Sequence, residues 1–267
     1  MKCGFTFTSI SVTSIYLIFT SIFVVLTACN SISDHQMKKK VNLKEYIAKL
    51  TTNKNDMTIK TFHFNFLQVN TYVVYDETKE AVIIDPGNQM EKENDSLVAF
   101  IAKEGLKVKY ILNTHPHIDH ILGNSFCVKT FGAPLWIHEA GIPIYNNASA
   151  YGVAFGFDAA EYPVADRYLK EGDEIVFGHQ KWEVIYTPGH ADGSVCFLDR
   201  QNNLIFVGDV LFEGSIGRAD LPTGNAEVLI KNIKEKLMTL EEETVVYCGH
   251  GDCTTIGKEK KQNPYIN

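Results

Sequence analysis

The stretch Thr114-His115-Pro116-His117-Ile118-Asp119-His120 comes one residue after a largely apolar run at residues 108–112. It places three imidazoles and one carboxylate within six residues. Side chains of these types are poor neighbours for a buried strand unless something pairs with them, and a divalent metal is the obvious partner. In an extended turn His115 and His117 point the same way, which leaves Asp119 and His120 to face a second metal. The alternative is a polar loop whose histidines are incidental.

Three more candidate ligands follow, each at the end of a strand-like run. His190 follows residues 182–186, Asp209 follows residues 204–206, and His250 follows residues 244–247. Each has small or turn-forming neighbours, which let the backbone turn sharply and approach a metal. One such residue alone is typical of an ordinary loop. Four such places at strand exits predict a metal centre, and a two-metal centre needs shared ligands of this kind.

This set of residues resembles the metallo-β-lactamase superfamily, and within it the short glyoxalase II-like thioesterases of the hydroxyacylglutathione hydrolase group. Residues 208–212 and 215–222 are similar to the signature of that group around its bridging aspartate. The tail at residues 249–257 and 263–265 is similar as well. The resemblance runs from about Met57 to the C-terminus. It implies an α+β fold, the αββα sandwich with one catalytic domain, whereas periodicity alone predicts only a mixed α and β chain.

The resemblance also implies a role for each candidate ligand. A first metal would be held by His115, His117 and His190, a second by Asp119, His120 and His250, and Asp209 would bridge them. The cofactors would be two divalent ions, with Zn²⁺ favoured and iron or manganese compatible with the same ligands. Asp119 and Asp209 would be the catalytic carboxylates, because Asp119 can accept a proton from water held between the two cations and orient the hydroxide that results.

Two further residues have expected roles near this centre. Asp85 follows a buried strand, and we expect it to hold a ligand histidine by its free nitrogen, although a simple Asp-Pro-Gly turn explains it equally. Arg218 lies nine residues after Asp209. We expect it either to meet a substrate carboxylate or to pair with Asp220.

The implied reaction is hydrolysis of a small-molecule acyl thioester, since a thiolate leaves without a strong general acid. The chain leaves no room after His250 for the helical domain that helps larger glyoxalase II enzymes bind glutathione, so the thiol half stays open. The alternatives are a mononuclear, iron-dependent persulfide dioxygenase and a metallo-hydrolase of another ester or lactone. Class B1 β-lactamases are disfavoured, because they carry a cysteine where Asp209 stands and do not use His120 as a ligand.

Composition excludes some classes of function. An apolar share of 45% supports a sizeable core, and a net charge of −7 argues against nucleic acid, which needs a basic surface. The cysteines show no CxxC spacing, so no disulfide framework is implied.

The N-terminus has two interpretations. Residues 15–26 are apolar and end in Leu26-Thr27-Ala28-Cys29, which resembles a bacterial lipobox. Residues 1–29 would then be a lipoprotein signal or membrane anchor, with attachment through Cys29. Residues 30–56 would be a linker with a short amphipathic stretch at 41–50, and residues 57–267 the hydrolase domain. Alternatively the protein begins near Met57 and is cytoplasmic.

Periodicity predicts several elements of the body. Residues 59–66 alternate like a strand, and residues 71–75 and 81–84 form a hairpin. Residues 95–104 form a helix that starts at Asp95 or Ser96 and stops at Gly105. The leucines and isoleucine at 229, 233, 237 and 240 repeat at helical spacing. Residues 141–160 are a pocket wall or lid formed by Tyr145, Tyr151, Phe155 and Phe157, or else a surface helix packed on its own aromatics.

Overall fold

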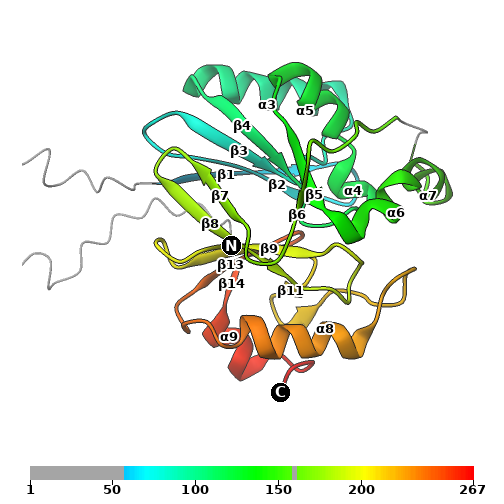
Figure 1. Ribbon diagram of the computed structural model, residues 1–267, viewed down its shortest axis with the longest axis vertical. Coiled ribbons are helices and arrows are strands. Elements are labelled where there is room, and N and C mark those ends of the chain that lie inside the picture. The colour runs from blue at the N-terminus through cyan, green and yellow to red at the C-terminus, as the bar shows by residue number, and fades with distance from the viewer. Residues whose placement is uncertain (1–56, 158–160) are drawn as a thin grey trace, which may run out of the picture. The chain divides into compact units, whose positions relative to one another are not determined.

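Two six-stranded sheets lie face to face in the computed structural model, which describes residues 57–157 and 161–267 (Figure 1). The first sheet has the order β1 (Thr58–Phe64), β2 (Val69–Tyr75), β3 (Glu80–Ile84), β4 (Lys107–Leu112), β5 (Leu135–His138) and β6 (Arg167–Leu169). The second has the order β14 (Thr254–Thr255), β13 (Val245–Cys248), β10 (Leu204–Gly208), β9 (Val195–Asp199), β8 (Gln180–Tyr186) and β7 (Glu174–Phe177).

Helices cover the outer face of each sheet (Figure 1). Over the first sheet lie α3 (Glu91–Glu104) and α5 (Asn124–Phe131), and over the second lie α8 (Ala226–Asn232), the π-turn η3 (Ile233–Leu237) and α9 (Ile256–Gln262). Shorter elements connect them: α4 (Ile118–Ile121), η2 (Glu139–Gly141), α6 (Ile142–Asn146), α7 (Ala148–Ala154) and the small hairpin β11 (Leu211–Phe212) and β12 (Ser215–Ile216). The predicted αββα sandwich is confirmed.

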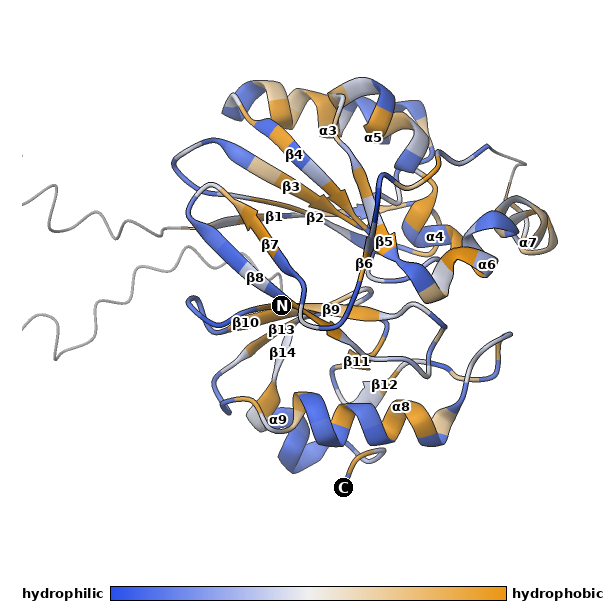
Figure 2. Ribbon diagram, viewed as in Figure 1, coloured by the Kyte–Doolittle hydropathy of each residue, from blue (hydrophilic) through white to orange (hydrophobic). Residues whose placement is uncertain are grey.

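Alternation along the strands separates three apolar layers. On β2, Tyr72 and Val74 pack between the sheets, while Val73 and Tyr75 pack beneath the helices. A strand buried on both faces in this way has no polar face, which explains why 69–75 is apolar almost throughout. Figure 2 shows the same division, with apolar strands inside and polar residues on the outward sides of the helices.

The hairpin of β2 and β3 is confirmed, and so is the first strand, except that β1 ends at Phe64 and Asn65 and Phe66 lie in the turn that follows. The predicted start of the first helix is wrong: α3 begins at Glu91, four residues before Asp95. The carboxylate of Glu93 accepts the backbone N–H groups of Gln89 and Met90 and thereby caps the first turn. Its end is as predicted, at Gly105 in the left-handed conformation.

The later helical repeat is confirmed only in part. Leu229, Ile233 and Leu237 are buried against the second sheet, but α8 gives way to a π-turn and Leu240 lies beyond its end. The lipobox at Cys29, the anchor, the linker and the stretch 41–50 lie outside the described residues. In the described part of the chain, no helix combines the length and hydropathy needed to cross a bilayer.

Candidate metal centre

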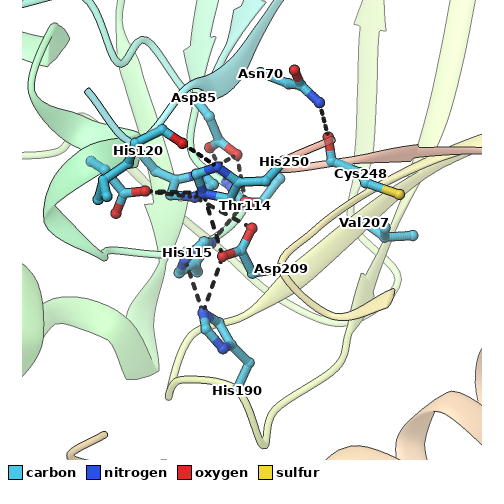
Figure 3. Close-up of polar contacts among 12 residues, drawn as sticks. Asn70, Asp85, Thr114, His115, His120, His190, Val207, Asp209, Cys248 and His250 are labelled. Carbon is cyan, nitrogen blue, oxygen red and sulfur yellow. Dashed lines mark hydrogen bonds and ion pairs between the residues drawn. The ribbon is translucent and has the colours of Figure 1, made fainter. Parts of the chain in front are cut away.

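The candidate ligands leave the two sheets at one shared edge. Strands β3 and β4 run parallel, and so do β10 and β13. Strand β8 runs in the same direction as β10, because both are antiparallel to β9. The loops after these five strands therefore meet at the carboxyl ends of the strands, where α/β proteins usually bind ligands. Figure 3 shows the resulting cluster of histidines and aspartates.

The first group of side chains consists of His115, His117 and His190. Their ligand atoms all lie within 4.8 Å of one another. His115 and His190 are buried, His117 is half-buried, and the Nε2 atoms of His115 and His190 are 3.2 Å apart. Three imidazoles at this spacing suit Zn²⁺ or Fe²⁺.

The second group consists of Asp119, His120 and His250, whose ligand atoms also lie within 4.8 Å of one another. The Oδ2 atom of Asp119 is 3.1 Å from His250 Nε2 and 3.5 Å from His120 Nε2. The two imidazoles approach to 3.3 Å between their Nε2 atoms. This group therefore combines two nitrogens with one charged oxygen.

Asp209 lies between the two groups. Its Oδ1 is 3.4 Å from His120 Nε2, and its Oδ2 is 3.7 Å from both His190 Nε2 and His250 Nε2. One carboxylate thus faces ligands of both groups, the position that a bridging ligand requires. The structure brings together all seven residues that the sequence analysis named as ligands.

The hydrogen bonds of the Nδ1 atoms fix how the imidazoles are presented. Nδ1 of His190 lies 2.7 Å from the carbonyl oxygen of Arg218, and Nδ1 of His250 lies 3.0 Å from that of Leu67. A carbonyl only accepts, so both Nδ1 atoms carry the proton and Nε2 is left for a metal. Protein partners of this kind are typical of metal-binding histidines.

Thr114 and Asp85 fix the other two imidazoles. Asp85 Oδ2 accepts from the Thr114 hydroxyl at 2.6 Å and lies 3.0 Å from His120 Nδ1. Since the only hydroxyl proton of Thr114 goes to Asp85, its oxygen accepts from His115 Nδ1 at 3.0 Å. Asp85, His115 and His120 also lie at metal-ligand spacing, but Asp85 contacts His120 at Nδ1, on the side opposite Asp119 and Asp209. Asp85 thus orients a ligand, as one of its two expected roles requires.

The arrangement fits divalent metal ions. Nε2 of His115 and Nε2 of His190 face each other at 3.2 Å although both rings carry their proton on Nδ1. Two lone pairs at that distance repel unless a cation lies between them. In addition, the buried Oδ1 of Asp209 has no hydrogen-bond partner. A buried carboxylate oxygen without a donor is costly, and a metal ion would satisfy it.

The electrostatics differ between the two groups. Burial lowers the pKa of His115 well below its usual value and that of His117 to about 3, and it also lowers the pKa of His190. Burial opposes the charge of His120 too, but the carboxylates of Asp119, Asp209 and Asp85 outweigh it and raise the pKa of His120 well above its usual value. The first group is therefore neutral, and the second lies in a negative field.

The interactions that raise the pKa of His120 lower the pKa values of the two aspartates near it. Burial alone would raise the pKa of Asp209, but His120, His190 and His250 together hold it far below its usual range. The pKa of Asp119 is likewise lowered, because His120 and His250 outweigh the effect of burial. Both carboxylates are therefore ionised near neutral pH and available to a cation.

Sequence reasoning missed two residues at this site. A Cβ atom on Gly249 would lie 2.1 Å from Asp209 Oδ1 and 2.8 Å from His120 Cε1, so only glycine leaves room for that carboxylate. Asn65 donates from its side chain to the backbone oxygens of Asp119 and Gly87. The Gly-His-Gly sequence around His250 could have indicated that the backbone at Gly249 lies close to the metal centre. Nothing in the sequence distinguishes Asn65 from other turn residues.

A cavity of about 520 Å³ opens beside the metal centre and has His117, Asp119, Asp209 and His250 at its base. Arg218 lines the cavity and pairs with Asp220 through two contacts of 2.8 Å. The expected pair with Asp220 is thus observed, and contact with a substrate carboxylate stays a prediction. Of the four aromatic residues expected in the cavity wall, Tyr151, Phe155 and Phe157 line it. Tyr145 does not, because it is buried and donates its hydroxyl to the carbonyl of Pro163.

Comparison with known proteins defines the family. Residues 64–250 match the metallo-β-lactamase superfamily, and the chain belongs to that superfamily. Over 213 residues the chain is 33% identical to the hydroxyacylglutathione hydrolase GloC of Haemophilus influenzae, covering 79% of this chain and 99% of that relative.

Two solved structures are similar at comparable identity. BLEG-1, a B3 metallo-β-lactamase, has 34% identity and a TM-score of 0.71 over 79% of this chain and 100% of its own. TTHA1623 in a di-iron-bound form has 35% identity and a TM-score of 0.70 over 77% of this chain and 99% of its own. The chain is thus a metallo-hydrolase whose His/Asp cluster suits divalent metal ions.

Proposed function

We propose that the protein is a binuclear metal-dependent thioesterase of the hydroxyacylglutathione hydrolase type. The observation that carries this proposal is the convergence of two ligand groups on one shared carboxylate, Asp209, at the base of an open cavity. The similarity to GloC supports the thioester as substrate.

The chain's own residues account for much of such a reaction. His115, His117 and His190 would hold one metal ion, and Asp119, His120 and His250 the other. When bound, the ions would lower the pKa of a water molecule at the site and polarise the thioester carbonyl. Asp119 faces the cavity, so its carboxylate can orient that water and accept its proton. The departing thiolate is stable at neutral pH, so no strong acid is needed beside it.

We propose Zn²⁺ as the metal pair, with iron or manganese as alternatives. Nitrogen ligands predominate, with Asp119 in the second group and Asp209 shared between the groups, and such sites accept all three metals. The di-iron form of TTHA1623 supports iron as the first alternative.

A second candidate is hydrolysis of β-lactams, which the similarity to BLEG-1 favours. Both reactions begin with attack of activated water on an acyl carbon, so the same centre would serve either. They differ in the leaving group, because a lactam nitrogen needs a proton as it departs and a thiolate does not.

Metal analysis of the purified full chain, together with a substrate panel, tests the proposal. We expect about two metal ions per chain and turnover of acyl thioesters, S-lactoylglutathione included, above that of nitrocefin. The variant His120→Ala should keep about one metal and lose orders of magnitude in rate. Unchanged turnover in His120→Ala, or oxygen uptake with glutathione persulfide, would indicate a mononuclear dioxygenase instead.

A further inference from the structure

We infer that the bulkier half of the substrate is an uncharged, apolar group, aromatic or branched aliphatic, and that glutathione is a poor fit. The reaction in this inference rests on the proposed function, whereas the choice of ligand rests on the cavity alone.

The cavity beside the metal centre has one polar end and one apolar end. Ligand side chains line one part of it, and the rest is lined mostly by apolar residues from several segments. Phe66 and Leu67 come from the turn between β1 and β2, Ile118 from α4, and Tyr151 and Phe155 from α7 and its C-cap. A volume of about 520 Å³ lies within the range that small-molecule sites usually have.

Large apolar side chains are exposed on these walls. Phe66 is 62% exposed, Leu67 46%, Tyr151 42% and Phe155 54%. Single exposed apolar residues need no explanation, but four around one cavity form a patch of the kind that binds apolar ligands. A ligand group that covered them would remove this apolar surface from water.

The aromatic wall is firmly attached to the metal centre. The rings of Phe66 and Phe157 stack at 4.7 Å between centroids and join the β1–β2 turn to the segment after α7. Gly152 lets α7 pack closely on α4, because a Cβ atom there would lie 3.0 Å from Ile118. The same turn holds His250 through the carbonyl of Leu67. The apolar wall is therefore joined directly to the segments that carry ligands of the metal centre.

The side chains that line the cavity offer little to pair with the two carboxylates of glutathione. Of the described residues that line the cavity, Arg218 alone is a lysine or arginine. Its guanidinium already forms a bidentate pair with Asp220, and a second carboxylate would have to compete with that partner. A neutral ligand needs no such partner.

Two thioesters that share the lactoyl group test the inference: S-lactoylglutathione and the lactoyl thioester of benzyl mercaptan. We expect kcat/KM to be about ten-fold higher for the benzyl compound, the discrimination that a few apolar contacts give. Phe155→Ala should lower the ratio of the two kcat/KM values, benzyl over glutathione, by a similar factor. Val153→Ala is the matched control, because Val153 lies on α7 two residues before Phe155, is 55% exposed and is not among the residues lining the cavity.

The pair of Arg218 and Asp220 provides an independent arm. Asp220→Asn releases the guanidinium, so kcat/KM for S-lactoylglutathione should rise several-fold while the value for the benzyl thioester stays the same. A wild-type enzyme that prefers S-lactoylglutathione would overturn the inference.

A binding measurement separates this inference from the proposed reaction. The neutral fluorophore N-phenyl-1-naphthylamine should bind the full chain at one site, and Phe155→Ala and Tyr151→Ala should each weaken it about ten-fold, unlike Val153→Ala. Binding of this kind without turnover of any thioester would refute the thioesterase and leave the apolar ligand in place. If neither substitution changed the affinity for the fluorophore, the inference of an apolar ligand would be refuted, whatever the turnover.

Discussion

The two ligand groups of the metal centre are built from similar side chains in opposite electrostatic surroundings. Burial keeps His115, His117 and His190 neutral, with pKa values below the usual range. His120 and His250, which lie beside ionised aspartates, have raised pKa values. The first group therefore presents free lone pairs at any physiological pH. The second attracts positive charge strongly, and protons compete there with a metal.

The largest effect should come from removing the carboxylate that the two groups share. Asp209→Ala leaves the first group without a negative ligand and the second with Asp119 alone, so we expect both metals to be weakened and turnover to fall about a thousand-fold. Metal content and kcat measured together check this. Asp95→Ala, on the exposed side of α3, is the control. Near-normal metal content with near-normal turnover would contradict the binuclear assignment.

A smaller effect should follow from crowding that carboxylate without removing it. In Gly249→Ala the new methyl group would overlap Asp209 Oδ1, so the carboxylate must shift relative to both groups. A displacement of this size costs about a hundred-fold in rate, with metal content reduced but not abolished.

Gly251→Ala is the matched control for this substitution. A Cβ atom on Gly251 meets nothing within 4 Å, although the backbone there has a φ of +70°. It should lower thermal stability slightly and spare the metals. Equal losses of metal in the two variants would show that strain in the loop, rather than the overlap, is responsible.

The sequence allowed the ligands to be predicted because their chemistry restricts residue type. His190 and Asp209 are far from the central motif along the chain, yet both follow apolar runs and precede turns. The residues that position these ligands were harder to predict from the sequence. Asn65 acts through hydrogen bonds to backbone oxygens, which many polar residues could make.

The fold shows the same limit. The end of α3 was predictable because Gly105 adopts a conformation that favours glycine. Its start was not, because a glutamate side chain and not the expected Asp95 or Ser96 caps the helix. The orientation of Tyr145 depends on a contact with Pro163, which no local pattern reveals.

Asp85 contacts His120 of the second group, so a substitution of Asp85 is a third test of the difference between the two ligand groups. Asp85→Asn keeps the shape of the side chain but removes the charge beside His120 Nδ1. We expect the second metal to bind about 10 to 100 times more weakly, with the first metal affected less. Titration of metal-free protein with Zn²⁺ should resolve the two steps.

Asp76→Asn is the control for Asp85→Asn. Asp76 is also buried and accepts several hydrogen bonds, but it follows β2, at the opposite edge of the sheet. It should lower stability without altering metal binding. If Asp85→Asn weakened both metals equally, the charge of Asp85 would serve the whole centre and not the second group.

The mildest test varies pH alone. In the metal-free protein the pKa values of His120 and His250 are raised, so these imidazoles take up protons as pH falls through a range where the first group is still neutral. A metal in the second group must then displace protons, and its affinity should fall by about ten-fold per pH unit for each proton displaced. In the first group the pKa of His117 is lowered to about 3, and the pKa values of His115 and His190 are lowered too. Protons therefore compete with the metal there only at lower pH. Equilibrium dialysis against a buffered Zn²⁺ concentration between pH 8 and pH 5 should therefore show metal content falling from two ions per chain to one before the last is lost. Simultaneous loss of both ions would mean that the two groups titrate as one unit, and the difference in their surroundings would then have no consequence for metal binding.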